Sequence, residues 1–270
     1  MSESTLNTRL LEYLQTLQLP ASRETFDLSL PAEELPQAVR LASGPGGPAI
    51  VAIPSTVALC GPHQYLDFAK PFRGIRDLFA LPVPGFVKGE RLPASVDAAV
   101  TLAAGEVQRC VNDGVVLVGY SSGGTLAYAI ARHLQESSVS VAAVALIDAY
   151  PFAAVNADTA RTQALLRKMF EDSELRRFLN ATRLSAMAWY TKLFVDWELS
   201  EVAAPTLLVQ PEQPMPGMPT TAEWRSSWPY PHDLARVSGD HWTMMTEHAE
   251  ATAWAIENWL PASTTSGVPA

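Results

Sequence analysis

Residues 115–124 read Val-Val-Leu-Val-Gly-Tyr-Ser-Ser-Gly-Gly, and this stretch decides the expected fold. A short apolar run leads into a G-x-S-x-G sequence from Gly119 to Gly123, and residues 125–134 continue with a helical pattern. A strand, a sharp turn and a helix in this order form a nucleophile elbow, which lifts a strained serine above the end of a sheet. The stretch therefore predicts Ser121 as a nucleophile. The alternative is a glycine-rich βα turn with a capping serine.

Apolar runs on both sides of this elbow predict further strands. Strands are expected at residues 48–54, 78–83, 141–147, 205–209 and 234–237, and further helices at residues 93–111 and 243–260. Strands that alternate with helices imply a mostly parallel central sheet with helices on both faces. Residues 37–151 and 201–261 are accordingly expected to form one α/β core.

Three other regions do not follow this alternation. Residues 152–200 hold helical patterns but no strand, which favours a helical lid insertion over packing helices of the core. Within residues 1–36, leucines at helical spacing predict an amphipathic helix at residues 5–17 that covers the core or meets a partner helix. The tail at residues 262–270 is small and polar, and it is expected to be disordered.

Composition excludes several classes of function. The 270 residues are 48% apolar and 17% charged, which suits a globular protein with a sizeable core. A net charge of −9 argues against nucleic-acid binding. Cys60 and Cys110 fit neither a disulfide framework nor a zinc site, so no metal is expected. Residues 1–4 lack signal-peptide features and no apolar run is long enough to span a membrane, which predicts a cytoplasmic protein.

A serine hydroxyl needs a base within hydrogen-bond reach, and histidine is the usual one. The five candidates are His63, His133, His232, His241 and His248. His241 lies in a loop between the strand at 234–237 and the last helix, where hydrolases with a nucleophile elbow carry the base. His63, in the loop after an early strand, is the alternative.

The base in turn needs an orienting carboxylate. Asp148 ends the apolar run 141–147, and the carboxyl end of a strand is where open α/β sheets bind ligands. Asp240 is too close in sequence to His241 to orient its ring, and Asp196 falls in the expected lid. The alternative role for Asp148 is to cap the following segment. The expected triad is therefore Ser121, Asp148 and His241.

Seven segments in a fixed order carry a family resemblance. They are residues 54–63 (PSTVALCGPH), 83–86 (VPGF), 89–93 (GERLP), 119–124 (GYSSGG), 146–151 (LIDAYP), 228–233 (WPYPHD) and 239–245 (GDHWTMM). Their order and spacing resemble the thioesterase domains that end modular type I polyketide synthases. The resemblance implies an α/β-hydrolase fold, and it supports Asp148 as the acid.

The same resemblance implies roles for further residues. The oxyanion hole is expected to use the backbone amides of Val57, beside Thr56, and of Ser122. Tyr120 stands where the family more often has histidine, and this exchange should alter packing without removing the chemistry. Substrate contacts are expected from Tyr150, Tyr120, Trp189, Tyr190 and Phe194.

The implied reaction releases a polyketide. An acyl chain passes from the phosphopantetheine arm of an acyl carrier protein to Ser121, and water or the chain's own hydroxyl then frees it as an acid or a macrolactone. No other cofactor is expected, and the helix at residues 5–17 would pair two subunits. The alternatives are a stand-alone editing thioesterase or general carboxylesterase with the same triad, and a catalytically inactive carrier-protein docking module.

Overall fold

The computed structural model describes residues 23–28, 36–111, 114–137, 139–151, 159–194, 196–218 and 224–260. The amphipathic helix expected at residues 5–17, with the dimer it would form, lies outside the described residues. So does the tail at residues 262–270.

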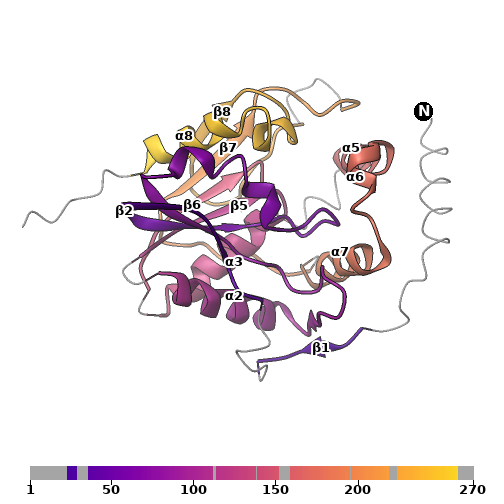
Figure 1. Ribbon diagram of the computed structural model, residues 1–270, viewed down its shortest axis with the longest axis horizontal. Helices are drawn as coiled ribbons and strands as arrows, with labels where there is room; N and C mark the ends of the chain where they lie inside the picture. Colours follow the sequence, from indigo (N-terminus) through magenta and orange to yellow (C-terminus); the bar gives the residue numbers. More distant parts are fainter. Residues whose placement is uncertain are drawn as a thin grey trace, which may run out of the picture.

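A six-stranded sheet forms the centre of the molecule (Figure 1). Across the sheet the strands are β3 (Arg76–Ala80), β2 (Val39–Ile53), β5 (Val115–Tyr120), β6 (Val141–Ile147), β7 (Thr206–Pro211) and β8 (Asp233–Val237). The pairs β2–β5, β5–β6, β6–β7 and β7–β8 are parallel. The expected parallel sheet is therefore confirmed, and β2 begins earlier than residue 48.

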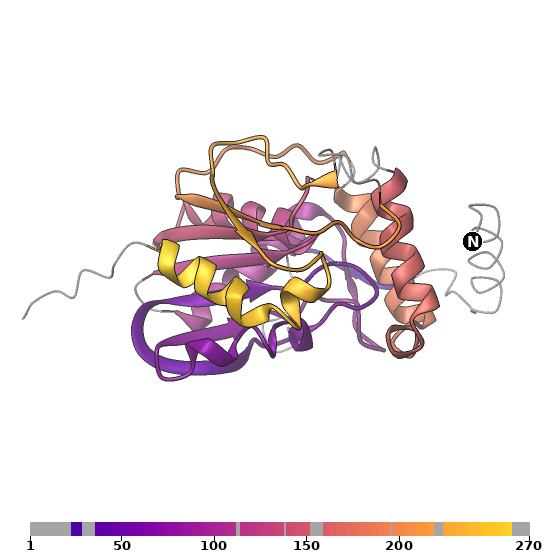
Figure 2. The same cartoon turned by 90° about the horizontal axis from the view of Figure 1, so that it is seen from above.

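Helices cover both faces of this sheet, as Figures 1 and 2 show. Helices α2 (Val96–Cys110) and α3 (Gly123–Leu134) lie on one face, and α8 (Ala249–Trp259) lies on the other. Strand β5 serves both cores: Leu117 joins the cluster under α2 and α3, while Val116 and Val118 join the cluster under α8. A strand covered on both faces has no polar side, which explains its continuous apolar run.

Two helix starts differ from the expectation. Pro93 does not open a helix, because it lies in the short strand β4 (Leu92–Pro93), which pairs with β1 (Thr25–Phe26). Helix α2 begins three residues later, where the Ser95 hydroxyl accepts from the Ala98 amide at 3.1 Å. The final helix is also shorter than expected: residues Thr243–Met245 form the 3₁₀ turn η5, and α8 starts only at Ala249.

Three helices lie between β6 and β7. They are α5 (Thr159–Glu171), α6 (Ser173–Arg176) and α7 (Ala181–Phe194), and the described part of residues 152–200 contains no strand. Figures 1 and 2 place all three at one end of the sheet rather than on either face. We call residues 159–194 the insertion; its action as a lid stays a prediction. No helix in the described ranges is long and apolar enough to cross a membrane.

Candidate active site

Ser121 directly follows β5 in a strained turn. Its φ is 56°, in the left-handed region that costs a residue other than glycine about 1–3 kcal/mol. The sheet holds this conformation, because the Ser121 amide donates to the Ile147 carbonyl at 2.9 Å. Helix α3 begins two residues later with Ser122 as its N-cap. The strand, turn and helix expected around the serine are therefore all present.

Two glycines of the G-x-S-x-G sequence allow the turn to close. A Cβ at Gly119 would lie 2.5 Å from the Cα of Gly124, and a Cβ at Gly123 would lie 2.4 Å from the carbonyl oxygen of Pro54. Both neighbours are backbone atoms, which cannot rotate away as a side chain can. These positions therefore accept only glycine while β2, β5 and α3 keep their present spacing.

The expected acid and base are hydrogen-bonded to each other. Asp148 follows β6 with φ of 40°, and its Oδ2 lies 2.7 Å from Nδ1 of His241. Both side chains are almost completely buried, 2% and 3% exposed. Because Tyr120 pairs with Ile147 across β5 and β6, Ser121 and Asp148 leave the same edge of the sheet. No hydrogen bond in the described part of the chain joins the Ser121 hydroxyl to His241.

The other four histidines lie in different surroundings. His63 is exposed and stacks on Phe178 of the segment after α6, with ring centroids 5.7 Å apart. His133 and His232 are exposed, and His248 is the N-cap of α8. Among the five, only His241 is hydrogen-bonded to a carboxylate at the edge of the sheet.

Tyr120 contacts His241, and its expected part in substrate binding stays a prediction. Its hydroxyl donates to the His241 carbonyl at 2.7 Å, and its ring stacks on the imidazole with centroids 4.9 Å apart. Burial, together with the nearby Asp148, holds the pKa of Tyr120 well above its usual range. The phenol therefore stays protonated and joins the last residue of β5 to the loop that carries the base.

Tyr150 contacts the acid. Its hydroxyl donates to Oδ1 of Asp148 at 2.9 Å, while Arg161 of α5 lies over its ring with Cζ 3.7 Å from the centroid. Burial and the Asp148 charge raise the pKa of Tyr150 well above its usual range, so this phenol also remains a donor. The sequence gives no sign of Arg161, because no local pattern links it to the Tyr150 ring or to the Trp224 carbonyl.

The expected oxyanion residues are brought together, with one correction. The Thr56 amide donates to the Ser122 hydroxyl at 2.8 Å, and the Thr56 hydroxyl lies 3.0 Å from the same oxygen. Thr56 therefore has no amide to offer an oxyanion; it ties its loop to the start of α3. Within the described ranges the amides of Val57 and Ser122 have no acceptor, so both are open to a ligand.

Arg183 of α7 holds the same loop from the side of the insertion. Its Nη1 donates to the carbonyls of Ala58 and Cys60 at 3.0 and 2.8 Å. An apolar cluster joins this loop to the insertion and reaches Trp242, next to His241; its buried members are Ala58, Leu59, Met169, Leu179 and Leu184, with Val57 and Trp242 packed against them. The cluster packs the insertion against the oxyanion loop and against Trp242.

The three aromatic residues of α7 that are expected to contact substrate pack against the core. Tyr190 and Phe194 are fully buried in the core under α2 and α3, and Trp189 packs against it. The hydroxyl of Tyr190 donates to the Pro84 carbonyl at 3.1 Å, and the indole of Trp189 donates to the Pro93 carbonyl at 2.8 Å. Their contacts anchor the insertion to the core, and their expected part in substrate binding stays a prediction.

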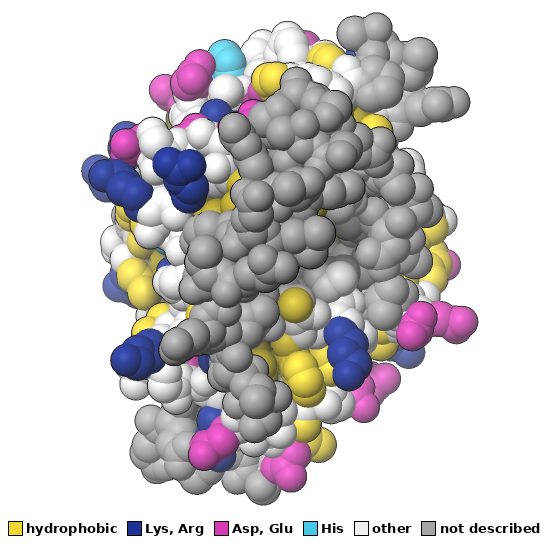
Figure 3. Space-filling view, turned by 90° about the vertical axis from the view of Figure 1, so that its right-hand side faces the viewer, with side chains coloured by type: hydrophobic (Ala, Val, Ile, Leu, Met, Phe, Trp, Pro, Cys, Tyr) yellow, Lys and Arg dark blue, Asp and Glu magenta, His cyan; other side chains and the backbone are white. Residues whose placement is uncertain are grey.

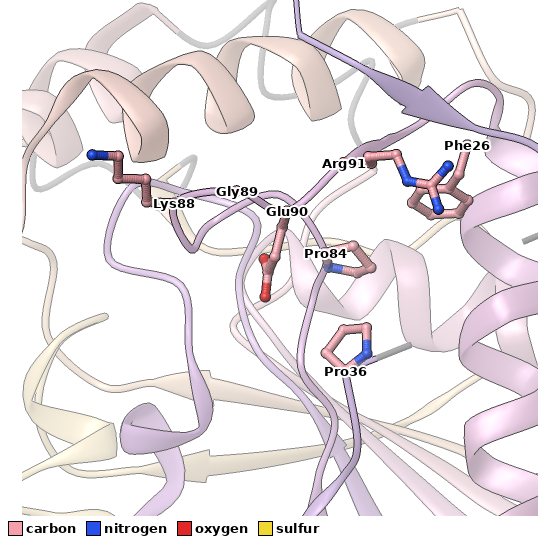
Figure 4. Close-up of a pocket in the computed structure, with 7 residues that line it drawn as sticks. All are labelled: Phe26, Pro36, Pro84, Lys88, Gly89, Glu90 and Arg91. Atoms are coloured by element: carbon pink, nitrogen blue, oxygen red, sulfur yellow. The ribbon is translucent and has the colours of Figure 1, made fainter. Parts of the chain in front are cut away.

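Two of the hollows on the described surface lie toward the insertion or beside β1 and β4. One, of about 450 Å³, lies beside β1 and β4, where Figure 4 shows Pro36, Pro84 and Glu90 around it; none of the expected catalytic residues lines it. The other, of about 250 Å³, lies between α5 and residues 215–216 and reaches Trp242, so it borders the site. The described residues contain no cluster of three side chains suited to a metal.

Known proteins are similar to this chain over most of its length. Residues 49–260 match the family described as "Thioesterase domain". The chain is 40% identical to polyketide synthase GfsE of Streptomyces halstedii over 257 residues, 92% of this chain. It is 37% identical to erythronolide synthase EryA3 of Saccharopolyspora erythraea over 223 residues, 82% of this chain. It spans only 7% of the length of either relative.

Solved structures show the same fold. The NocB thioesterase domain from the nocardicin cluster, determined as a covalent complex with a fluorophosphonate nocardicin G analogue, superposes with a TM-score of 0.61. The superposition covers 80% of this chain and 96% of that domain, at 19% identity. The fold is therefore that of the α/β-hydrolases.

Proposed function

The chain belongs to the thioesterase domain family, and from that premise we propose that it releases an acyl chain from a carrier protein by way of an ester on Ser121. The observation that carries the proposal is the strained serine at the end of β5, beside the hydrogen-bonded Asp148 and His241 at the same edge of the sheet. We assign these three residues the roles of nucleophile, acid and base.

The first step forms the ester. The Ser121 oxygen attacks the thioester carbonyl as His241 takes its proton, and Asp148 stabilises the charged imidazole through Nδ1. The amides of Val57 and Ser122 receive the negative oxygen of the intermediate, and loss of one such donor typically costs about 100- to 1000-fold in rate. The C–S bond then breaks, and His241 returns the proton to the departing thiol.

The second step frees the acyl chain. Water or a hydroxyl of the chain itself attacks the ester carbonyl, His241 accepts the new proton, and the proton returns to Ser121 as the ester bond breaks. Water gives an acid, and an internal hydroxyl gives a macrolactone. The partly exposed apolar side chains of Val57 and Trp242, beside the oxyanion loop and the base, suit an acyl chain next to the reacting carbon.

The charge of the insertion supports a substrate on a phosphopantetheine arm, whose phosphate is an anion. Residues 159–194 carry seven Lys and Arg against three Asp and Glu, although the whole chain has a net charge of −9. Figure 3 shows several Lys and Arg side chains, with hydrophobic and acidic ones, on the described part of the face at this end of the molecule. Such a surface attracts an anionic arm and guides it toward the sheet edge. Because both cysteines are free thiols, we also infer a cytoplasmic location.

Ser121→Ala tests the proposal directly. We expect release from an acyl carrier protein to fall by at least about 1000-fold, because the attacking oxygen is gone while the fold is kept. Ser137→Ala, at an exposed serine after α3, is the matched control and should keep full activity. Chromatography with mass spectrometry identifies the product as an acid or a macrolactone.

The same assay separates the alternatives. A carboxylesterase would turn over simple esters as readily as carrier-bound chains, and an inactive docking module would bind the carrier protein without releasing anything. Release at the native rate by Ser121→Ala would contradict the proposal.

A further inference from the structure

Arg161 is a charged side chain buried close to the site. It lies on α5 of the insertion and is only 4% exposed. A guanidinium stays charged in proteins, and burial of a charge costs free energy unless polar or π-electron partners compensate it. Two of its contacts do so: Nη2 donates to the Trp224 carbonyl at 2.6 Å, and Cζ lies 3.7 Å from the centroid of the Tyr150 ring.

Tyr150 passes this contact on to the acid. Its hydroxyl donates to Oδ1 of Asp148, while Oδ2 of the same carboxylate holds His241. The backbone of Tyr150 is fixed separately, because the Thr125 hydroxyl donates to its carbonyl at 2.9 Å. What remains to be fixed is the direction of the phenol ring, and the guanidinium lies against that ring.

We propose that Arg161 is a positioning residue for the acid: stacked on Tyr150, it keeps the phenol hydrogen-bonded to Asp148 and so links α5 to the Asp148–His241 pair. The proposal rests on the proposed function, in which this pair activates Ser121. Because α5 belongs to the insertion, the orientation of the acid then depends on where this helix lies.

The proposal has a consequence for pH dependence. A hydrogen bond to Oδ1 and a nearby positive charge both draw negative charge away from Oδ2, which weakens its hold on a protonated imidazole. Removal of the Tyr150 hydrogen bond or of the Arg161 charge therefore stabilises the protonated imidazole, which cannot act as a base. The acid limb of the pH–rate profile should therefore move to higher pH. The other ionisable groups near His241, Tyr120 at the end of β5 and Asp240 in its own loop, stay unchanged.

The test uses Tyr150→Phe, Arg161→Met and the double variant of the full chain. The readout is the second-order rate of fluorophosphonate labelling at Ser121 across pH, with thermal unfolding to show that each variant is folded. We expect each single variant to slow labelling by roughly 5- to 30-fold and to move the acid limb upward by about half a unit to one unit. The double variant should be no slower than the slower single variant, because both changes break the same link.

Arg40→Met is the matched control. Arg40 also lies over an aromatic ring, with Cζ 5.0 Å from the Phe79 centroid, but in the pairing of β2 with β3 rather than beside Asp148. This variant should label at the native rate with an unchanged profile. Arg161→Lys, which keeps the charge but not the planar fork, should recover part of the rate.

Several results would overturn the proposal. Effects of the two single variants that multiply in the double variant would show that Arg161 does not act through Tyr150. An acid limb that stays in place, or an Arg161→Met rate equal to that of Arg40→Met, would also overturn it. If Arg161→Met does not fold, Arg161→Lys and Tyr150→Phe are used instead. An acid limb that stays in place, or a labelling rate equal to that of Arg40→Met, would overturn the proposal in these variants too. A native chain that is not labelled at Ser121 would instead contradict the proposed function itself.

Discussion

The two sides of the site are held by different kinds of interaction. On one side, Ser121 and Asp148 take positive φ at the ends of neighbouring strands, and backbone hydrogen bonds to Ile147 and Val209 fix them. On the other side, the oxyanion loop at residues 55–60 is tied down by side chains, namely Ser122, Gln64 and Arg183. The sheet therefore fixes the conformations of Ser121 and Asp148. The oxyanion loop depends instead on single side chains, each of which a mutation can remove.

This difference predicts two kinds of response to mutation. A change that moves the strand ends should destroy activity and stability together, since the strained conformations persist only while the sheet enforces them. A change in the oxyanion loop should lower the rate in steps, because each side chain contributes one or two hydrogen bonds.

The largest effect is expected from Gly123→Ala. The new Cβ would lie 2.4 and 2.5 Å from the carbonyl oxygens of Pro54 and Ile53, so backbone must move apart. We expect a loss of about 2–4 kcal/mol in the free energy of unfolding, measured by urea denaturation, and loss of labelling at Ser121. Gly105→Ala in α2 is the control: its Cβ meets only open space and one side chain at 4.0 Å, so it should stabilise the chain by about 0.5–1 kcal/mol. Equal stability of the two variants would contradict the strand-end account.

A smaller effect is expected from Tyr120→Phe, which tests whether the strand end also holds the base. The ring stays stacked on His241, but the hydrogen bond to its buried carbonyl is lost. We expect kcat to fall by about 10-fold with little change in KM, and the free energy of unfolding to fall by roughly 1–2 kcal/mol. Unchanged kcat would show that the stacked ring alone holds His241 in position, without the hydrogen bond.

Arg183→Met addresses the other side of the site. Loss of its hydrogen bonds to Ala58 and Cys60 loosens the oxyanion loop, so we expect a decrease in kcat of about 3- to 10-fold. The matched control is Arg132→Met on α3, where an exposed arginine lies 3.7 Å from Glu136 and should contribute little. If Arg183→Met lost activity as completely as Gly123→Ala, the proposed difference between the strand ends and the oxyanion loop would be wrong.

The smallest effect concerns the two thiols, Cys60 in the oxyanion loop and Cys110 at the end of α2. Burial raises the pKa of Cys110 to about 11 and holds the pKa of Cys60 above its usual range. Below these values the thiols stay protonated and unreactive, so iodoacetamide at pH 8 should leave the enzyme fully active, and alkylation of Cys110 should speed up only as the pH approaches 11. Rapid inactivation at pH 8 would point to a thiol in the reaction.

The same division explains how far sequence reasoning reached. The elbow, the parallel strands, Asp148 and His241 are visible because each depends on a local pattern and its place in the chain order. Sequence reasoning predicts substrate contacts for Tyr120, Trp189 and Tyr190 but not the protein contacts they make, because an aromatic side chain gives no local sign of the partner it packs against. Arg161 and Arg183 were missed for a related reason: their partners are rings and carbonyls of distant segments, and only tertiary packing brings them together.

The most direct measurement is the site and rate of fluorophosphonate attachment in the native chain and in His241→Gln, mapped by mass spectrometry of peptides. The account predicts a single adduct on Ser121, formed at least about 100-fold more slowly without the imidazole. An adduct on another residue, or the same rate in both chains, would contradict the claim that the strand-end geometry makes this one hydroxyl reactive.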